Sequence, residues 1–246
     1  MEITSIELVI VYSLHHTLVS NQRPLYWARH LVKGLTKALD NLNNIRMDVR
    51  VGLVTYGGRG KWKEPRAILL EGKFLRTPRQ AYHHILADVQ PGLEEIDASQ
   101  AILTGSDFPF RKASVKVVFL IHDGQSPGSA GSKADNSHLL KVLKSRDVVL
   151  VTSAPYAQFI EQGPIGLWAN GELIVTGPTT SHPTDPYNDV IKSTGGFWLD
   201  WNALRQKHRP SRTKSRGLQA RNDVIETVVT NLHRLATDVQ TKRCHA

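Results

Sequence analysis

Short apolar runs rich in β-branched residues alternate along this chain with longer segments in which apolar residues recur at helical spacing. The short runs predict strands of a parallel sheet, because such strands are buried on both faces. The longer segments predict amphipathic helices that pack on the sheet. The predicted strands are residues 6–12, 47–56, 66–71, 115–121, 147–152, 173–175 and 197–199. The predicted helices are residues 24–42, 78–89, 97–104, 137–145, 187–192 and 218–239.

Strands and helices that alternate in this way predict an α/β fold with a doubly wound, mostly parallel, Rossmann-like central sheet flanked by helices. A chain of 246 residues is long enough to bury a sizeable core. We expect residues 1–202 to form the body of one domain and residues 203–217 to be a basic loop or linker. Residues 218–239 would then be a helix packed on the same domain, followed by a tail at 240–246.

The apolar run at residues 115–121 ends abruptly in His122, Asp123 and Gly124. Ligand sites in open α/β sheets form at the carboxyl ends of the strands, so Asp123 is a candidate functional group. The alternative interpretation is an acid that caps a turn with Gly124. The usual glycine-rich phosphate motifs and the G-x-S-x-G motif of hydrolases are absent from the sequence, so we expect neither an enzyme nor a cofactor.

The order and spacing of these pieces resemble the von Willebrand factor type A (vWA) family. The motifs that carry the resemblance are the strand and helix at 6–42, the second strand at 49–56, the fourth at 116–124, and residues 193–196 before the last strand. Together they cover roughly residues 6–239 of the chain. The resemblance implies a Rossmann-like sandwich that recognises proteins, usually through a bound divalent cation.

The resemblance also implies a metal site made of Asp-x-Ser-x-Ser after the first strand, a later threonine, and an aspartate after the fourth strand. In this chain Tyr12, Leu14 and His16 stand at the three first-strand positions, and residues 92–97 contain no threonine. Asp123 alone matches the pattern. Magnesium requires several hard oxygen ligands in near-octahedral geometry. We therefore predict that the metal site is vestigial and binds no metal.

A different site is possible at the same place, because the resemblance makes the first and fourth strands neighbours. His15, His16, His122 and Asp123 would then lie on one edge of the sheet, beside Ser13. Imidazole and carboxylate ligands suit zinc, and histidines also suit a response to pH. The alternatives are therefore a zinc- or pH-responsive ligand site, a protein-binding surface made of these residues, and ordinary surface histidines.

The formal net charge of +9 is concentrated in one short segment between Ala203 and Gly217, which contains six basic residues and no acid. The rest of the chain carries close to +3, since 9 − 6 = 3. Such a segment could bind heparin or nucleic acid, or it could be a solvated linker. The basic residues are Arg205, Lys207, Arg209, Arg212, Lys214 and Arg216.

Three further features bear on partners and location. Trp62 lies in a basic stretch at residues 59–64 and is a candidate contact for a protein partner. Cys244 is the single cysteine, so a disulfide would need a partner outside this segment. No apolar run approaches the roughly 20 residues of a membrane span, and the first residues do not look like a signal peptide. With the resemblance, these features predict a non-enzymatic, protein-binding module of a larger, secreted protein.

Overall fold

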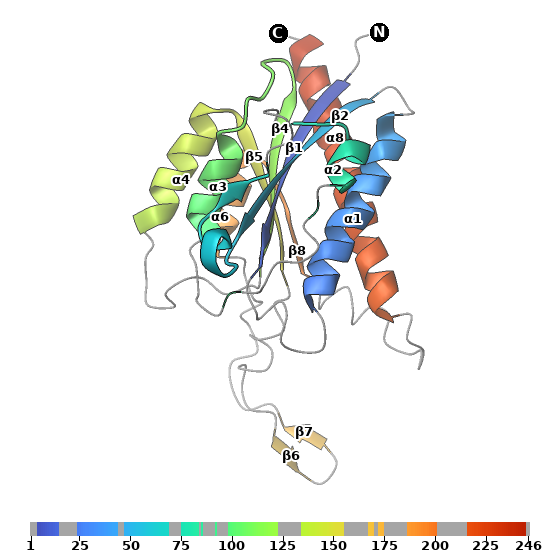
Figure 1. Cartoon of the computed structure of the whole chain (residues 1–246), viewed down its shortest axis with the longest axis vertical. Coiled ribbons are helices and arrows are strands. Elements are labelled where there is room, and N and C mark those ends of the chain that lie inside the picture. The colour runs from blue at the N-terminus through green and yellow to red at the C-terminus, as the bar shows by residue number, and fades with distance from the viewer. Residues whose placement is uncertain are drawn as a thin grey trace.

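The central sheet is built on β1 (Thr4–Ser13), which lies between β2 (Met47–Tyr56) and β4 (Val115–Ile121) (Figure 1). The strand order is β3-β2-β1-β4-β5-β8, completed by β3 (Arg66–Ala67), β5 (Val148–Ala154) and β8 (Trp198–Asp200). Every neighbouring pair is parallel except β2 and β3. This confirms the predicted doubly wound, mostly parallel α/β sheet.

The structure is a computed structural model. It describes residues 4–14, 24–43, 47–68, 75–83, 85, 92, 98–122, 134–154, 167–169, 172–174, 186–200 and 216–244.

Helices cover both faces of the sheet. One face carries α1 (Pro24–Asn43), α2 (Pro78–His83) and α8 (Arg216–Cys244), and the other carries α3 (Ala98–Ser106), α4 (Ala134–Ser145) and α6 (Asn188–Thr194) (Figure 1). None of the helices in the described part of the chain is long and apolar enough to cross a membrane.

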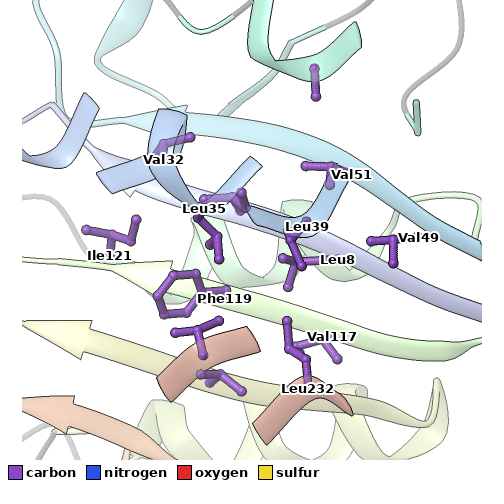
Figure 2. Packing of buried hydrophobic residues seen from close by; sticks show 14 of the residues in the cluster. Leu8, Val32, Leu35, Leu39, Val49, Val51, Val117, Phe119, Ile121 and Leu232 are labelled. Carbon is purple, nitrogen blue, oxygen red and sulfur yellow. The ribbon is translucent and has the colours of Figure 1, made fainter. Parts of the chain in front are cut away.

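Two hydrophobic clusters, one on each face, explain why the strand sequences are apolar at successive positions. Alternate β1 residues point to opposite faces, so Leu8 belongs to the cluster under α1 and α8, and Val9 belongs to the cluster under α3, α4 and α6. In the first cluster, Leu35 of α1 and Leu232 of α8 point toward the sheet beside Phe119 of β4 (Figure 2). The two-sided burial follows from the doubly wound topology.

Some elements differ from the predicted ranges. The last helix begins at Arg216 and ends at Cys244, beyond the predicted 218–239 at both ends, because apolar periodicity marks only the turns that bury apolar side chains. The predicted strand at 173–175 is β7 (Glu172–Ile174), which pairs with β6 (Leu167–Ala169) in a separate hairpin. The helix predicted at 78–89 is described over Pro78–His83. The predicted domain boundaries remain a prediction.

The outer edge of β2 is covered by short pieces of chain. β3 pairs with it through Ala67 opposite Val54 and Arg66 opposite Thr55. Further along β2, Val51 and the residue Arg76 exchange two backbone hydrogen bonds, at 2.7 and 3.0 Å. Of the edge strand predicted at 66–71, the structure describes residues 66–68, and the first two of these form β3.

A buried acid lies at the opposite end of the sheet from the predicted site. Glu7 is fully buried within β1 and accepts hydrogen bonds from the backbone N–H and the Nε of Arg111, both at 2.6 Å, and from the Ser114 hydroxyl at 3.0 Å. The other guanidinium nitrogens of Arg111 donate to Asp48 and to Ser5. This cluster ties the loop between α3 and β4 to the first residues of β1 and β2.

The environment of Arg111 stabilises its charge. Partial burial lowers the pKa of the guanidinium, but its hydrogen bonds and Coulombic attraction to Asp48 and Glu7 outweigh burial, so the pKa of Arg111 is raised. Arg111 is therefore a permanent cation that compensates the buried Glu7 carboxylate.

Candidate functional site

The carboxyl ends of the parallel strands meet along one edge of the sheet, which we call the crest. In register, Ser13 of β1 lies opposite Tyr56 of β2, and Tyr12 lies opposite Ile121 of β4. β5 joins the same row through Ser153, opposite Ile121. The crest is the place where the α/β topology puts ligand sites.

Backbone hydrogen bonds hold three chain segments together at the crest. The Leu14 N–H donates to the Tyr56 carbonyl at 2.7 Å, and the Gly92 N–H lies 3.2 Å from the Leu14 carbonyl and 3.1 Å from that of Gly57. A Cβ on Gly92 would lie 2.1 Å from the Gly57 oxygen, so only glycine permits this approach. No motif in the sequence marked Gly92 as a contact of this turn.

Two of the positions assigned to metal ligands hold side chains of the hydrophobic core. Tyr12 and Leu14 are each 2% exposed, and both belong to the cluster that packs under α1 and α8. The Leu14 side chain also lies beside Gly58 and Trp62. The phenol oxygen of Tyr12 is buried with the rest of its side chain, so neither residue presents an oxygen at the surface of the crest.

On the other face of the crest, Ser13 and His122 are both buried. The His122 backbone N–H donates to the Ser153 carbonyl at 3.1 Å. Its ring meets the buried Tyr187 in an edge-to-face contact, with the ring centres 6.1 Å apart. Since β1 and β4 are neighbours and Tyr12 lies opposite Ile121, His122 follows directly beside the end of β1. Tyr187 was not predicted as its neighbour, because 65 residues separate the two rings along the chain.

The remaining predicted site residues lie outside the described residues. They are His15, His16, Asp123, and the basic residues from Arg205 to Lys214; Arg216 is the first residue of α8. Among the residues that the structure does describe, no three His, Cys, Asp or Glu side chains gather closely enough to hold a metal ion.

Trp62 lies next to the crest, in the turn that connects β2 to β3. It ends a short 3-10 helix, η2 (Gly60–Trp62), and is half-buried, packed against the core cluster that contains Leu14. The ammonium of Lys61 lies 5.2 Å from the ring centre. The residue is therefore held in place by the core and is not a fully exposed aromatic side chain.

Thr55, the β2 neighbour of Tyr12, carries a buried hydroxyl that has no hydrogen-bond partner within the described residues. A buried polar group without a partner costs free energy that an apolar group of the same shape avoids. We expect Thr55→Val to increase the free energy of unfolding by about 1 kcal/mol. Urea denaturation of the two proteins measures the difference, and Thr55→Ala is the control that removes the same hydroxyl but leaves a small cavity. A loss of stability in Thr55→Val would show that the hydroxyl is paired.

Comparison with solved structures places this topology among known folds. An aerotolerance-related membrane protein from Bacteroides fragilis matches with a TM-score of 0.51 and 12% identity, over 90% of this chain and 99% of that chain. Proximal thread matrix protein 1 from the mussel byssus matches with a TM-score of 0.52 and 12% identity, over 92% of this chain and 46% of that chain. A von Willebrand factor type A structure from Catenulispora acidiphila matches at 0.45, with 13% identity over 61% of this chain and 33% of that chain.

The protein has a von Willebrand factor type A fold. The sequence itself matches no family model, and no curated protein matches it significantly. At 12% identity, the matches show a shared fold alone. The chain spans about half the length of the byssus protein, at 46%.

Within the vWA fold, the two ends of the sheet differ in chemistry. At the crest, the side chains of Tyr12 and Leu14 are buried in the core. At the opposite end, Glu7 and Arg111 form a charged cluster that no sequence motif marked. The crest is therefore the candidate interaction site, and the charged cluster is part of the framework.

Proposed function

We propose that this vWA-type module binds a protein partner at its crest without a bound cation. The observation that carries the proposal is the burial of Tyr12 and Leu14 in the core, at two of the positions that the vWA resemblance assigns to oxygen ligands. Magnesium keeps near-octahedral geometry and gives up its waters reluctantly, so it needs fixed oxygen ligands. The crest instead has a buried tyrosine and a buried leucine at these positions.

The same reasoning supports a binding role rather than catalysis. A vWA fold offers a rigid sheet whose loops can recognise a partner, and the chain lacks the phosphate-binding and nucleophile motifs named above. One protein of this fold is a thread matrix protein of the mussel byssus, and this chain covers 46% of its length. We therefore place the module in a larger, secreted, non-enzymatic protein, where Cys244 could pair with a cysteine outside this segment.

The experiment that tests cation independence is calorimetry of the metal-stripped protein against Mg²⁺, Ca²⁺ and Zn²⁺. We expect no binding heat for any of the three ions, because the first-strand oxygen ligands are absent. His16→Ala and Asp123→Ala are the matched variants. Zinc heat that both substitutions abolish would instead identify the histidines as a metal site and overturn the proposal.

The second part of the test concerns the partner. Proteins retained on the immobilised chain should be the same in EDTA and in Mg²⁺, and Trp62→Ala should reduce their retention, since a well-packed tryptophan is a typical hot spot. Tyr82→Ala is the matched control, because Tyr82 is an exposed aromatic residue on α2. Retention that requires Mg²⁺, or no retained protein at all, contradicts the proposed function.

A further inference from the structure

The turn between β2 and β3 concentrates positive charge beside the crest. Residues 59–66, which we call the basic turn, contain four basic residues and one acid, Glu64, for a net charge of +3 (4 − 1). The basic residues, all of them exposed, are Arg59, Lys61, Lys63 and Arg66. The turn reaches the crest through Trp62, which lies beside Gly58 and Leu14.

Backbone hydrogen bonds fix the shape of the basic turn. The Gly57 N–H donates to the Lys63 carbonyl at 3.0 Å, and the Gly58 N–H donates to the Trp62 carbonyl at 2.8 Å. Gly57 and Gly60 supply the positive φ angles, +75° and +58°, that the tight reversal needs. A partner that binds here would not have to order this backbone first, which lowers the cost of association.

The positive charges of the turn are available to a partner. Arg59, Lys61 and Arg66 make no ion pair with any residue in the described part of the chain. The Lys61 ammonium instead lies over the Trp62 ring. Such an arrangement leaves several exposed cations around one anchored tryptophan, and tryptophan and arginine are both enriched at protein-binding hot spots.

We propose that the basic turn docks an acidic segment of the protein partner. This inference rests on the proposed function and adds the chemistry of the partner. Carboxylates on the partner would pair with Arg59, Lys61 and Arg66 around the Trp62 contact, and complementary charge would speed and orient the encounter. The turn would thus supply, through its own side chains, the positive charge that a bound cation supplies at a crest with oxygen ligands.

The placement of Trp62 favours an acidic protein segment over single-stranded nucleic acid. Proteins that bind single strands stack bases on aromatic faces. Here the Trp62 side chain is half-buried against the core, and the Lys61 ammonium lies over the ring, so less of the ring is open to a stacked base than in a fully exposed tryptophan. The basic turn is also short, with eight residues and a net charge of +3, whereas proteins that bind duplex DNA neutralise many phosphates along a long polyanion.

The test measures the affinity of a fluorescent oligo-glutamate peptide by anisotropy. The triple variant Arg59→Glu, Lys61→Glu and Arg66→Glu should weaken binding at least about tenfold. The matched control reverses three exposed lysines on α4 and α6, Lys141→Glu, Lys144→Glu and Lys192→Glu, with the same change in net charge. We expect this control to weaken binding much less. Thermal unfolding of both variants establishes that they are folded.

Two outcomes overturn the inference. If the affinity for the peptide falls equally in the turn variant and in the lysine control, the affinity depends only on the net charge of the protein. Tighter binding of heparin or single-stranded DNA than of the peptide, lost in the turn variant, would assign the turn to another class of partner.

The partner capture described above separates this inference from the proposed function. If the turn variant retains as much protein in EDTA as the unmodified chain does, the inference of an acidic segment fails and the proposed function stands. If retention is lost with the turn variant and kept with the lysine control, both are supported.

Discussion

Arg111→Ala should destabilise the protein by about 3 kcal/mol or more, the largest effect we expect from removing a single side chain at the surface. The substitution removes the guanidinium that compensates Glu7, which is fully buried in β1. The carboxylate would keep hydrogen bonds from Ser114 and from one backbone N–H, but no counter-charge among the described side chains. Breaking a buried ion pair from one side leaves an uncompensated charge, which costs far more than the intact pair contributes. Urea denaturation measures the difference in free energy of unfolding.

Asp107→Ala is the matched control for this prediction. Asp107 pairs with Arg146 in the same loop region, but the two side chains are 62% and 38% exposed. Exposed ion pairs contribute at most about 1 kcal/mol, so this variant should be close to the unmodified protein. Equal effects of the two substitutions would contradict a special role for the Glu7 cluster. The double variant Glu7→Gln with Arg111→Ala should recover part of the loss, because it removes the buried charge.

The contribution of Arg111 should not weaken in alkaline solution. Its pKa is raised in the folded protein, so its stabilisation is fully present below the unfolded pKa and is lost only as the pH rises through the folded value. The pKa of Arg111 in the folded protein and its pKa in the unfolded chain both lie above the pH range in which proteins are usually studied. The difference in stability between the unmodified protein and Arg111→Ala should therefore stay constant from neutral pH to about pH 10.

Gly196→Ala should cost at least about 3 kcal/mol and should prevent folding if the rest of the domain is only marginally stable. A Cβ at this position would lie 1.7 Å from the backbone oxygen of Leu150 and 2.8 Å from its carbonyl carbon. Leu150 is in β5, an interior strand between β4 and β8, so the obstacle is backbone that cannot rotate away. The added methyl group would force apart the end of α6 and the sheet.

Gly195→Ala provides a control from the neighbouring residue. Gly195 has φ +77° at the end of α6, and a Cβ there would meet nothing within 4 Å. The cost is then limited to backbone strain in the left-handed region, about 1 kcal/mol. Yield of folded protein and urea denaturation distinguish the two variants. A Gly196→Ala protein as stable as Gly195→Ala would show that the close approach to β5 can relax.

The fold was predictable from the sequence because its core strands are apolar on both faces. Residues 6–12 and 115–121 can hardly be surface strands, and their spacing leaves room for the crossover helices between them. Pairings between distant residues were not predictable. Glu7 was visible as an acid within an apolar strand, but Arg111, 104 residues away, was one of many basic residues in this chain.

The candidate site was predictable in part. The resemblance predicted the position of the crest and assigned Tyr12 and Leu14 to positions of oxygen ligands. The burial of these side chains in the core follows from the strand register and is seen only in the structure. Trp62 was selected as an exposed contact and is instead half-buried beside Leu14. Its immobilisation depends on hydrogen bonds of the surrounding turn, which composition does not reveal.

The covered edge of β2 also bears on how copies of this protein behave in concentrated solution. An open strand edge is a template on which another chain can add a strand, the first step toward aggregates. Here the edge is occupied by the two-residue β3 and by the Val51–Arg76 bridge. Pro65, which lacks an N–H, precedes β3, and the exposed Arg66 places a positive charge on the outermost strand. On this side of the sheet, copies of the protein would repel one another and find little backbone to pair with, which favours a module that stays dispersed.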